Sequence, residues 1–273
     1  MLNKLTNLQQ RIVTGLSGAA LLVAGIWYSD WTYFIVFAII TGLSLLEFYK
    51  LIGAAGISSD RRFGLIGGLI LFACAFFIAK GSFDYSFLFL AAPALFLIFI
   101  IVLFQNKEKP FEKIAYTLLG ILYVALPFSL FTAVAFFPGE YTPEIVFGVL
   151  IIVWGNDIGG YIAGMTMGKH KLYARISPKK TWEGTMGGVV LGVAAAMVLS
   201  CFFTSLTIVS WSIVALMIVV FGSLGDLIES MLKRSLAIKD SGTMIPGHGG
   251  FLDRFDGLIF SLPFVAAYLI LFV

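Results

Sequence analysis

Apolar segments about as long as a membrane is thick recur along almost the whole of this sequence. A helix needs about 20 apolar residues to cross the hydrocarbon core of a bilayer. Only 12% of the 273 residues are charged, too few to cover the surface of a soluble domain of this length. We therefore predict an all-α polytopic membrane protein with about nine transmembrane helices. They lie near residues 12–28, 31–52, 62–79, 85–104, 114–137, 144–166, 185–205, 208–232 and 257–273.

Lys and Arg residues segregate when the loops between these segments are assigned alternately to the two sides of the membrane. One side receives all of the 18 Lys and Arg residues except Lys80. Cytoplasmic loops carry an excess of these residues, so we predict a cytoplasmic N-terminus and a C-terminus outside. With an even number of segments the basic residues would no longer fall on one side, so the distribution also supports an odd number. We expect a multi-pass protein of the cell membrane.

Carboxylates inside or at the ends of predicted helices gather in the second half of the chain. Asp157, Asp226 and Glu229 occupy such positions, where ionisable groups are costly and usually functional. On this basis we divide the chain into an N-terminal transmembrane scaffold, residues 1–150, and a C-terminal catalytic half, residues 151–273, whose site faces the cytoplasm.

One acidic residue of the first half also lies near the end of a predicted helix. This residue, Glu47, is far from the polar motifs in the sequence. We therefore expect the substitution Glu47→Gln to leave activity unchanged.

Two polar motifs flank the loop that follows the sixth predicted helix. In "WGNDIGGYIAGMTMGKHKL", Asn156 and Asp157 lie in an apolar helix. A carboxylate there needs a partner, a metal ion or a wet cavity, although the glycines could simply allow close helix packing. In "RISPKKTWEGT", Thr181 is a predicted helix N-cap with Glu183 in the first turn. The adjacent Lys179 and Lys180 suit a phosphate site, or a loop anchored at anionic headgroups.

Three charged side chains share one face of the eighth predicted helix. Asp226, Glu229 and Lys233 are spaced i, i+3 and i+7. Two carboxylates on one face could hold a divalent cation, with the lysine near a bound phosphate. The alternative is an ordinary i, i+4 ion pair between Glu229 and Lys233, worth a few tenths of a kcal/mol on an exposed helix.

The segment "KRSLAIKDSGTMIPGHGGFLDRFDG" then combines cations, carboxylates and a Gly-rich turn. Its glycines favour an irregular backbone whose N–H groups can bind an anion. This combination meets the needs of metal-assisted phosphoryl chemistry, in which the protein mainly positions its reactants. The phosphate-binding motifs of P-loop and dinucleotide folds are absent from the sequence.

The run from Ser230 to Asp256 resembles the signature of the phosphatidate cytidylyltransferase, or CDP-diglyceride synthetase, family. The matching residues are Ser230, Lys233, Arg234, Lys239, Asp240, Gly242, Pro246, His248, Gly249, Gly250, Asp253, Arg254 and Asp256. The "ND" pair and "SPKKTWEG" are also similar to family segments, so that the resemblance covers about residues 154–257. One departure is Met165, where many members carry a basic residue.

The resemblance implies a Mg²⁺-dependent synthesis of CDP-diacylglycerol and pyrophosphate from CTP and phosphatidate, with one or two metal ions. It implies catalytic roles for Asp226, Lys233, Lys239, Asp240, His248, Asp253 and Arg254. Substrate-binding roles follow for Asn156, Asp157, Lys179, Lys180, Thr181, Arg234, Gly249 and Gly250. The implied metal ligands are Asp226, Glu229, Asp253 and Asp256.

Other functions remain open at this point. A CTP-dependent kinase or transferase acting on another lipid, such as a polyprenol, would need similar groups. An ion-coupled transporter could use Asp157 and Asp226 as coupling sites, but the paired repeats typical of transporters are not visible. The expected partners are CTP, phosphatidate and membrane lipids, without nucleic acid, and a homodimer is compatible with the sequence.

Overall fold

The computed structural model describes residues 7–105, 108–238 and 249–273, with side chains from residue 13 onward. Within these residues, eight helical segments are long and apolar enough to cross a membrane, which confirms the predicted fold class. They are α2 (Asp30–Ala54), α3 (Arg61–Ala79), η2 (Tyr85–Leu90) with α4 (Ala91–Leu103), α5 (Pro110–Gly120) with η3 (Ile121–Ala125) and α6 (Leu126–Ala135), α7 (Pro143–Met167), α8 (Trp182–Phe202), α9 (Ile208–Ser235) and α10 (Leu252–Phe272).

The first predicted segment is helical as well. Helix α1 runs from Asn7 to Tyr28, and its described apolar part, Val13–Tyr28, is shorter than the other eight. Two short strands, β1 (Lys171–Tyr173) and β2 (Ser177–Thr181), form an antiparallel hairpin between α7 and α8.

The chain forms two compact units. The first consists of Met1–Thr132 and Ser235–Arg254, and the second of Ala133–Arg234 and Phe255–Val273. Each unit therefore combines segments that are distant in the sequence. The functional division at residue 150 stays a prediction.

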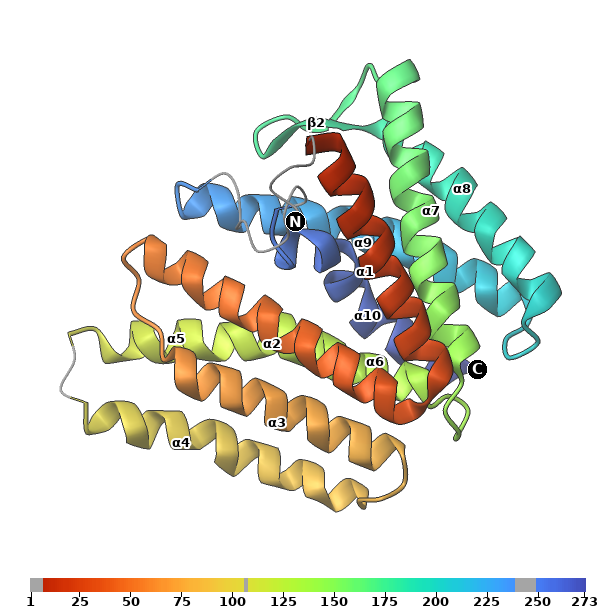
Figure 1. The fold of residues 1–273 in the computed structure, drawn as a ribbon. Helices are drawn as coiled ribbons and strands as arrows, with labels where there is room; N and C mark the ends of the chain where they lie inside the picture. The colour runs from red at the N-terminus through yellow and green to blue at the C-terminus, as the bar shows by residue number, and fades with distance from the viewer. Residues whose placement is uncertain (1–6, 106–107, 239–248) are drawn as a thin grey trace. The chain divides into compact units, whose positions relative to one another are not determined.

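In the first unit, α2 and α3 lie side by side (Figure 1) and bury aromatic rings between them. Phe34 of α2 packs on Phe72 and Phe76 of α3, with ring centroids 5.8 and 4.6 Å apart. Further along α2, Tyr49 packs against glycines of α3 and α5, and its hydroxyl donates to the Thr117 carbonyl at 2.7 Å. Twelve of the 25 residues of α2 are buried.

A polar network connects the beginnings of α3 and α5. Asp60, the N-cap of α3, accepts from the Phe63 N–H, and its carboxylate lies 3.2 Å from the Lys113 ammonium. Gln105 donates to the same carboxylate at 3.3 Å. Burial raises the pKa of Asp60, but the hydrogen bonds from Phe63, Gln105 and Lys113 outweigh burial and lower it below 3.8.

An ion pair also connects the end of α3 with the start of α2. The Lys80 ammonium, just after α3, lies 2.5 Å from the carboxylate of Asp30 at the start of α2. The same ammonium lies 4.2 Å from the ring centroid of Trp31. The one Lys predicted on the less basic side of the membrane is therefore paired.

In the second unit, glycines allow helices to pack with their backbones close together. Gly159 of α7 faces Gly187 of α8, and a Cβ atom at either position would collide with the other helix. Gly225 of α9 likewise faces the backbone of Asp256 on α10. Gly188 and Gly192 of α8 also pack against residues of α7 and α9 within the chain.

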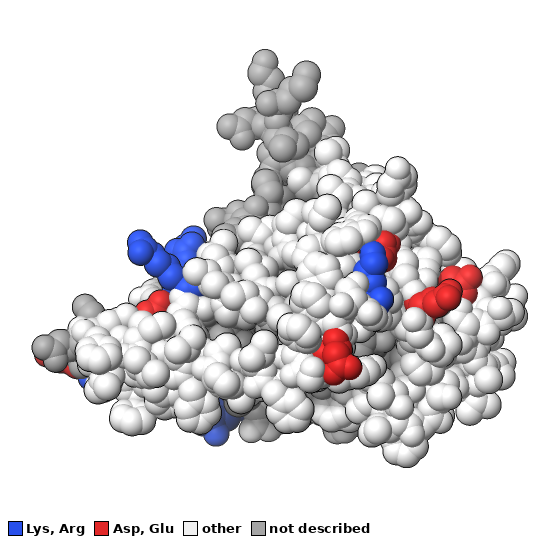
Figure 2. Space-filling model, turned by 90° about the horizontal axis from the view of Figure 1, so that it is seen from below, with Lys and Arg blue, Asp and Glu red and all other residues white. Residues whose placement is uncertain are grey.

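Much of the molecular surface is uncharged. On the face drawn in Figure 2, Lys, Arg, Asp and Glu are few and widely spaced. Large apolar side chains such as Phe89, Phe104 and Leu271 are exposed to the outside of the protein. Such a surface is suited to lipid and unsuited to water.

Candidate functional site

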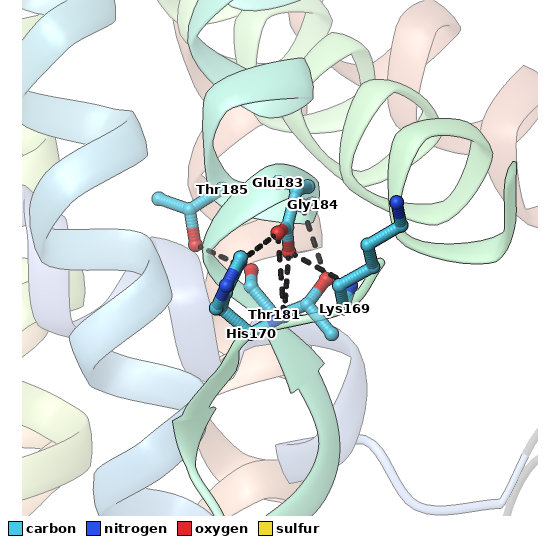
Figure 3. A network of polar contacts seen from close by, with 6 residues as sticks. All are labelled: Lys169, His170, Thr181, Glu183, Gly184 and Thr185. Carbon is cyan, nitrogen blue, oxygen red and sulfur yellow. Dashed lines mark hydrogen bonds and ion pairs between the residues drawn. The ribbon is translucent and has the colours of Figure 1, made fainter. Parts of the chain in front are cut away.

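The hairpin between α7 and α8 is held by the first turn of α8. The side chain of Thr181 accepts from the Gly184 N–H at 3.1 Å, which confirms the predicted N-cap. The Glu183 carboxylate lies 2.6 Å from His170 Nδ1 and also accepts from the backbone N–H groups of Lys169 and His170 (Figure 3). Both ends of the hairpin are thus fixed to one helix turn.

Strand β2 presents Lys180 to a carboxylate of α9. The Lys180 ammonium forms an ion pair with Asp226 and also contacts the carbonyl of Ser223. The Asp226 side chain is 43% exposed, so that a ligand can reach it. Lys179, the neighbouring residue, is exposed. The sequence predicts both lysines near phosphate; the pairing with Asp226 comes from the tertiary structure alone.

Two further carboxylates are connected electrostatically to this ion pair, one of them through the other. Asp256 of α10 interacts electrostatically with Asp226, Lys180 and Asp157 of α7. Its own carboxylate accepts from the Gly257 N–H at 2.7 Å. The close packing of α9 on α10 at Gly225 brings Asp226 and Asp256 onto touching helix segments. We call Asp157, Lys180, Asp226 and Asp256 the acidic cluster.

Asn156 lies beside this cluster on α7. Its amide donates to the Asp157 carboxylate at 3.4 Å, and its side-chain oxygen packs against Gly188 of α8. The functional role of this polar pair stays a prediction. The glycines of the motif allow close helix packing, and Asp157 interacts electrostatically with Asp256.

Glu229 and Lys233 form the ion pair that the sequence analysis keeps as an alternative. Their charged atoms are 2.6 Å apart, and the Glu229 side chain is only 2% exposed. Because the pair is buried, removing one partner would leave a charge in a poor environment, a larger effect than on an exposed helix. Arg234, the next residue, is exposed.

The remaining predicted site residues belong to the first unit or lie outside the described residues. Gly249 has a φ of 88°, in the left-handed region that favours glycine, and Gly250 is buried. Asp253 and Arg254 lie in the first turn of α10, the former half-buried and the latter exposed. Lys239, Asp240 and His248 fall outside the described residues.

Glu47 requires a correction. From its place in the sequence we expect it to be remote from the signature, but its carboxylate accepts from the Phe251 N–H at 2.6 Å. Leu252 N–H points to the same oxygen at 3.4 Å. Distance along the chain is a poor guide to distance in space, and the premise that Glu47 is remote from the signature is wrong. The activity of Glu47→Gln stays a prediction. The position of this carboxylate in an apolar helix is the sequence feature that could have indicated a role for Glu47.

Comparison of the sequence with models of known protein families shows the family of this chain. The model of the cytidylyltransferase family matches residues 9–272, which is nearly the whole chain. The chain belongs to this family. It is thus an enzyme, as predicted, of the nucleotidyltransferase type.

Curated relatives cover the chain at moderate identity. A protein of Bacillus subtilis named phosphatidate cytidylyltransferase is 30% identical over 98% of this chain and 100% of its own length. A protein of the same name from Staphylococcus haemolyticus is 39% identical over 66% of this chain and 68% of its own. Another from Staphylococcus epidermidis is 42% identical over 62% of this chain and 64% of its own.

The acidic cluster of this cytidylyltransferase offers ligands of the type that Mg²⁺ prefers. Asp226 and Asp256 supply carboxylate oxygens, and their mutual repulsion would be relieved by a hard cation. Among the described residues, no three His, Cys, Asp or Glu side chains are placed closely enough to form a complete metal centre. Substrate phosphates commonly complete the shell of Mg²⁺, so the donor set fits the metal.

Proposed function

We propose that this cytidylyltransferase makes CDP-diacylglycerol and pyrophosphate from CTP and phosphatidate, with Mg²⁺, at the cytoplasmic face of the cell membrane. The acidic cluster carries the proposal. It brings together Lys180 of β2 and carboxylates of α7, α9 and α10, in a protein with eight helical segments that are apolar enough to cross a membrane. The names of the full-length relatives supply the substrate class.

The proposed chemistry needs no activated side-chain nucleophile. An anionic oxygen of the phosphatidate phosphomonoester attacks the α-phosphorus of CTP. A new P–O bond forms, the bond from the α-phosphorus to the bridging oxygen breaks, and pyrophosphate leaves with the electron pair. Positioning two polyanions and stabilising the leaving group are the tasks of the protein.

The residues of the acidic cluster have complementary parts in this proposal. Lys180 is fixed beside Asp226 and can neutralise phosphate oxygens that enter the cluster. Asp226 and Asp256 would hold Mg²⁺, which when bound supplies charge neutralisation for the triphosphate. Asp253 and Arg254 of the first unit, and Lys239 and His248, keep the phosphate and metal roles that the family resemblance implies.

The decisive experiment follows the two ends of the CTP triphosphate separately. Purified protein is incubated with phosphatidate and with CTP labelled at either the α- or the γ-phosphate. The proposal expects α-label in the lipid fraction, γ-label in pyrophosphate, and loss of both products when a chelator removes Mg²⁺. A CTP-dependent kinase would instead put γ-label into the lipid and α-label into CDP.

Substrate controls test the lipid class. Diacylglycerol lacks the phosphate nucleophile and should give no labelled lipid. A polyprenol in place of phosphatidate should also be inert. Transfer of γ-label to either of these alcohols, or full activity in chelator, would contradict the proposal.

A further inference from the structure

Glu47 is a buried carboxylate that the proposed mechanism does not use. It lies on α2 and is 1% exposed. One of its oxygens, Oε2, accepts from the backbone of Phe251 at 2.6 Å, 204 positions away in the sequence. The other oxygen, Oε1, is buried and makes no hydrogen bond to any of the described residues. Burying a carboxylate is costly unless its contacts compensate.

The contacts of Glu47 lie at the beginning of α10. The first N–H groups of a helix have no partner within the helix and carry a partial positive charge. Phe251, just before the helix, has no side-chain oxygen that could cap it. Glu47 supplies the missing acceptor from a different helix, which makes it an N-terminal cap provided across the first unit.

The capped turn lies within the signature segment. Gly249, with its left-handed φ, and the buried Gly250 precede Phe251. Leu252, the first residue of α10, is fully buried. Asp253 and Arg254 follow immediately. A shift of the Phe251 backbone would therefore move both charged residues.

The helix that carries Glu47 is itself firmly held. Phe48, the next residue, is fully buried, and Tyr49 is bonded to the Thr117 carbonyl at 2.7 Å. The carboxylate is thus attached to a rigid part of the first unit. A rigid support is what accurate positioning of a catalytic group requires.

We propose that Glu47 is a positioning residue of this enzyme, which holds the Gly249–Arg254 turn through the Phe251 and Leu252 N–H groups. It acts through the turn and does not touch substrate. The activity readout rests on the proposed function, but the structural readout described below does not.

Two conservative substitutions separate geometry from charge. Glu47→Gln keeps an oxygen at the same reach and loses the charge, whereas Glu47→Asp keeps the charge and withdraws the oxygen by one methylene. If Glu47 positions the turn, the Glu47→Gln variant should keep kcat within about threefold of wild type. The Glu47→Asp variant should have a kcat lower on the order of tenfold or more, with little change in KM. The reverse order, with Asp more active than Gln, would overturn the proposal.

Hydrogen exchange supplies a readout that is independent of catalysis. Amide protection in peptides covering residues 249–256 should fall in Glu47→Asp and in Glu47→Met, and should stay close to wild type in Glu47→Gln. Ser44→Ala is the matched control, because Ser44 is equally buried on α2 and is one turn away from Glu47. It should change neither exchange nor kcat.

The two readouts distinguish the possible failures. If wild-type protein makes no CDP-diacylglycerol but the exchange pattern is as expected, the proposed function fails and the support of the turn by Glu47 stands. If Glu47→Met does not fold, Glu47→Asp still decides the matter. Wild-type protection and kcat in folded Glu47→Asp protein would show that Glu47 does not position the turn.

Discussion

Asp226 shows how one acidic side chain can be accommodated within an apolar helix. Its partner Lys180 comes from a hairpin strand, and the two form an ion pair at a partly exposed position. Asp256 interacts electrostatically with both members of this ion pair and with Asp157. Because these carboxylates outnumber Lys180 within the acidic cluster, a bound cation would be favoured there. The same arrangement would strongly disfavour an unaccompanied phosphate.

Replacing Asp226 with Asn should therefore affect turnover far more than folding. The substitution keeps the shape of the side chain and removes the charge that would hold Mg²⁺. We expect turnover to fall by about 100-fold or more at low Mg²⁺ concentration, since a metal contributes several kcal/mol at about 1.4 kcal/mol per tenfold in rate. The loss of turnover is measured by comparing initial rates of CDP-diacylglycerol formation by the variant and the wild type across a Mg²⁺ titration.

Glu144→Gln provides the matched control for that prediction. Glu144 is also a carboxylate of the second unit, but it lies in the first turn of α7 and bonds to Ser205. Its removal should leave the Mg²⁺ dependence unchanged. Near-normal turnover of Asp226→Asn at low Mg²⁺ would show that Asp226 does not bind the catalytic metal.

At the scale of elements, the second unit depends on helices whose backbones touch. Gly159 of α7 faces the Gly187 carbonyl of α8 so closely that a methyl group has no room. The hairpin that joins these helices is fixed by Thr181 and Glu183 at the start of α8. Close packing and a capped helix start together determine where β2 presents Lys180.

Two adjacent glycines test this packing. Gly159→Ala should destabilise the protein by about 1–3 kcal/mol, the usual cost of forcing extra atoms into a packed site. Gly160 is the matched control, because a Cβ atom there would be 3.6 Å from the Gly184 carbonyl, an ordinary contact. Gly160→Ala should be neutral or stabilise by up to about 1 kcal/mol.

Thermal unfolding of both variants in the same detergent measures the difference. The melting temperature of Gly159→Ala should be clearly below that of Gly160→Ala. Equal melting temperatures would contradict the close approach of α7 and α8.

At the scale of the whole molecule, charge distribution predicts how the protein lies in the membrane. Lys179 in the hairpin and Glu140 before α7 are both exposed, and the 25 residues of α7 separate the two loops. The excess of basic residues assigns the Lys179 loop to the cytoplasm and the Glu140 loop to the outside.

Single cysteines at these positions should react from opposite sides. In a background in which Cys74 and Cys201 are replaced, Glu140→Cys should react with a membrane-impermeant thiol reagent in intact cells. Lys179→Cys should react only after the membrane is opened. Labelling of both from the same side would contradict the predicted topology.

Local sequence determined the helices of this protein, their approximate ends and the Thr181 cap, because run length, polarity and capping act within a few neighbouring residues. The signature segments likewise identified the family. Tertiary structure alone decided which charges that are far apart in the sequence meet. The pairing of Lys180 with Asp226, and the capping of α10 by Glu47, join residues 46 and 204 positions apart. Such contacts depend on how whole helices pack, and helix packing follows from shape and close glycine contacts that no single stretch of sequence contains.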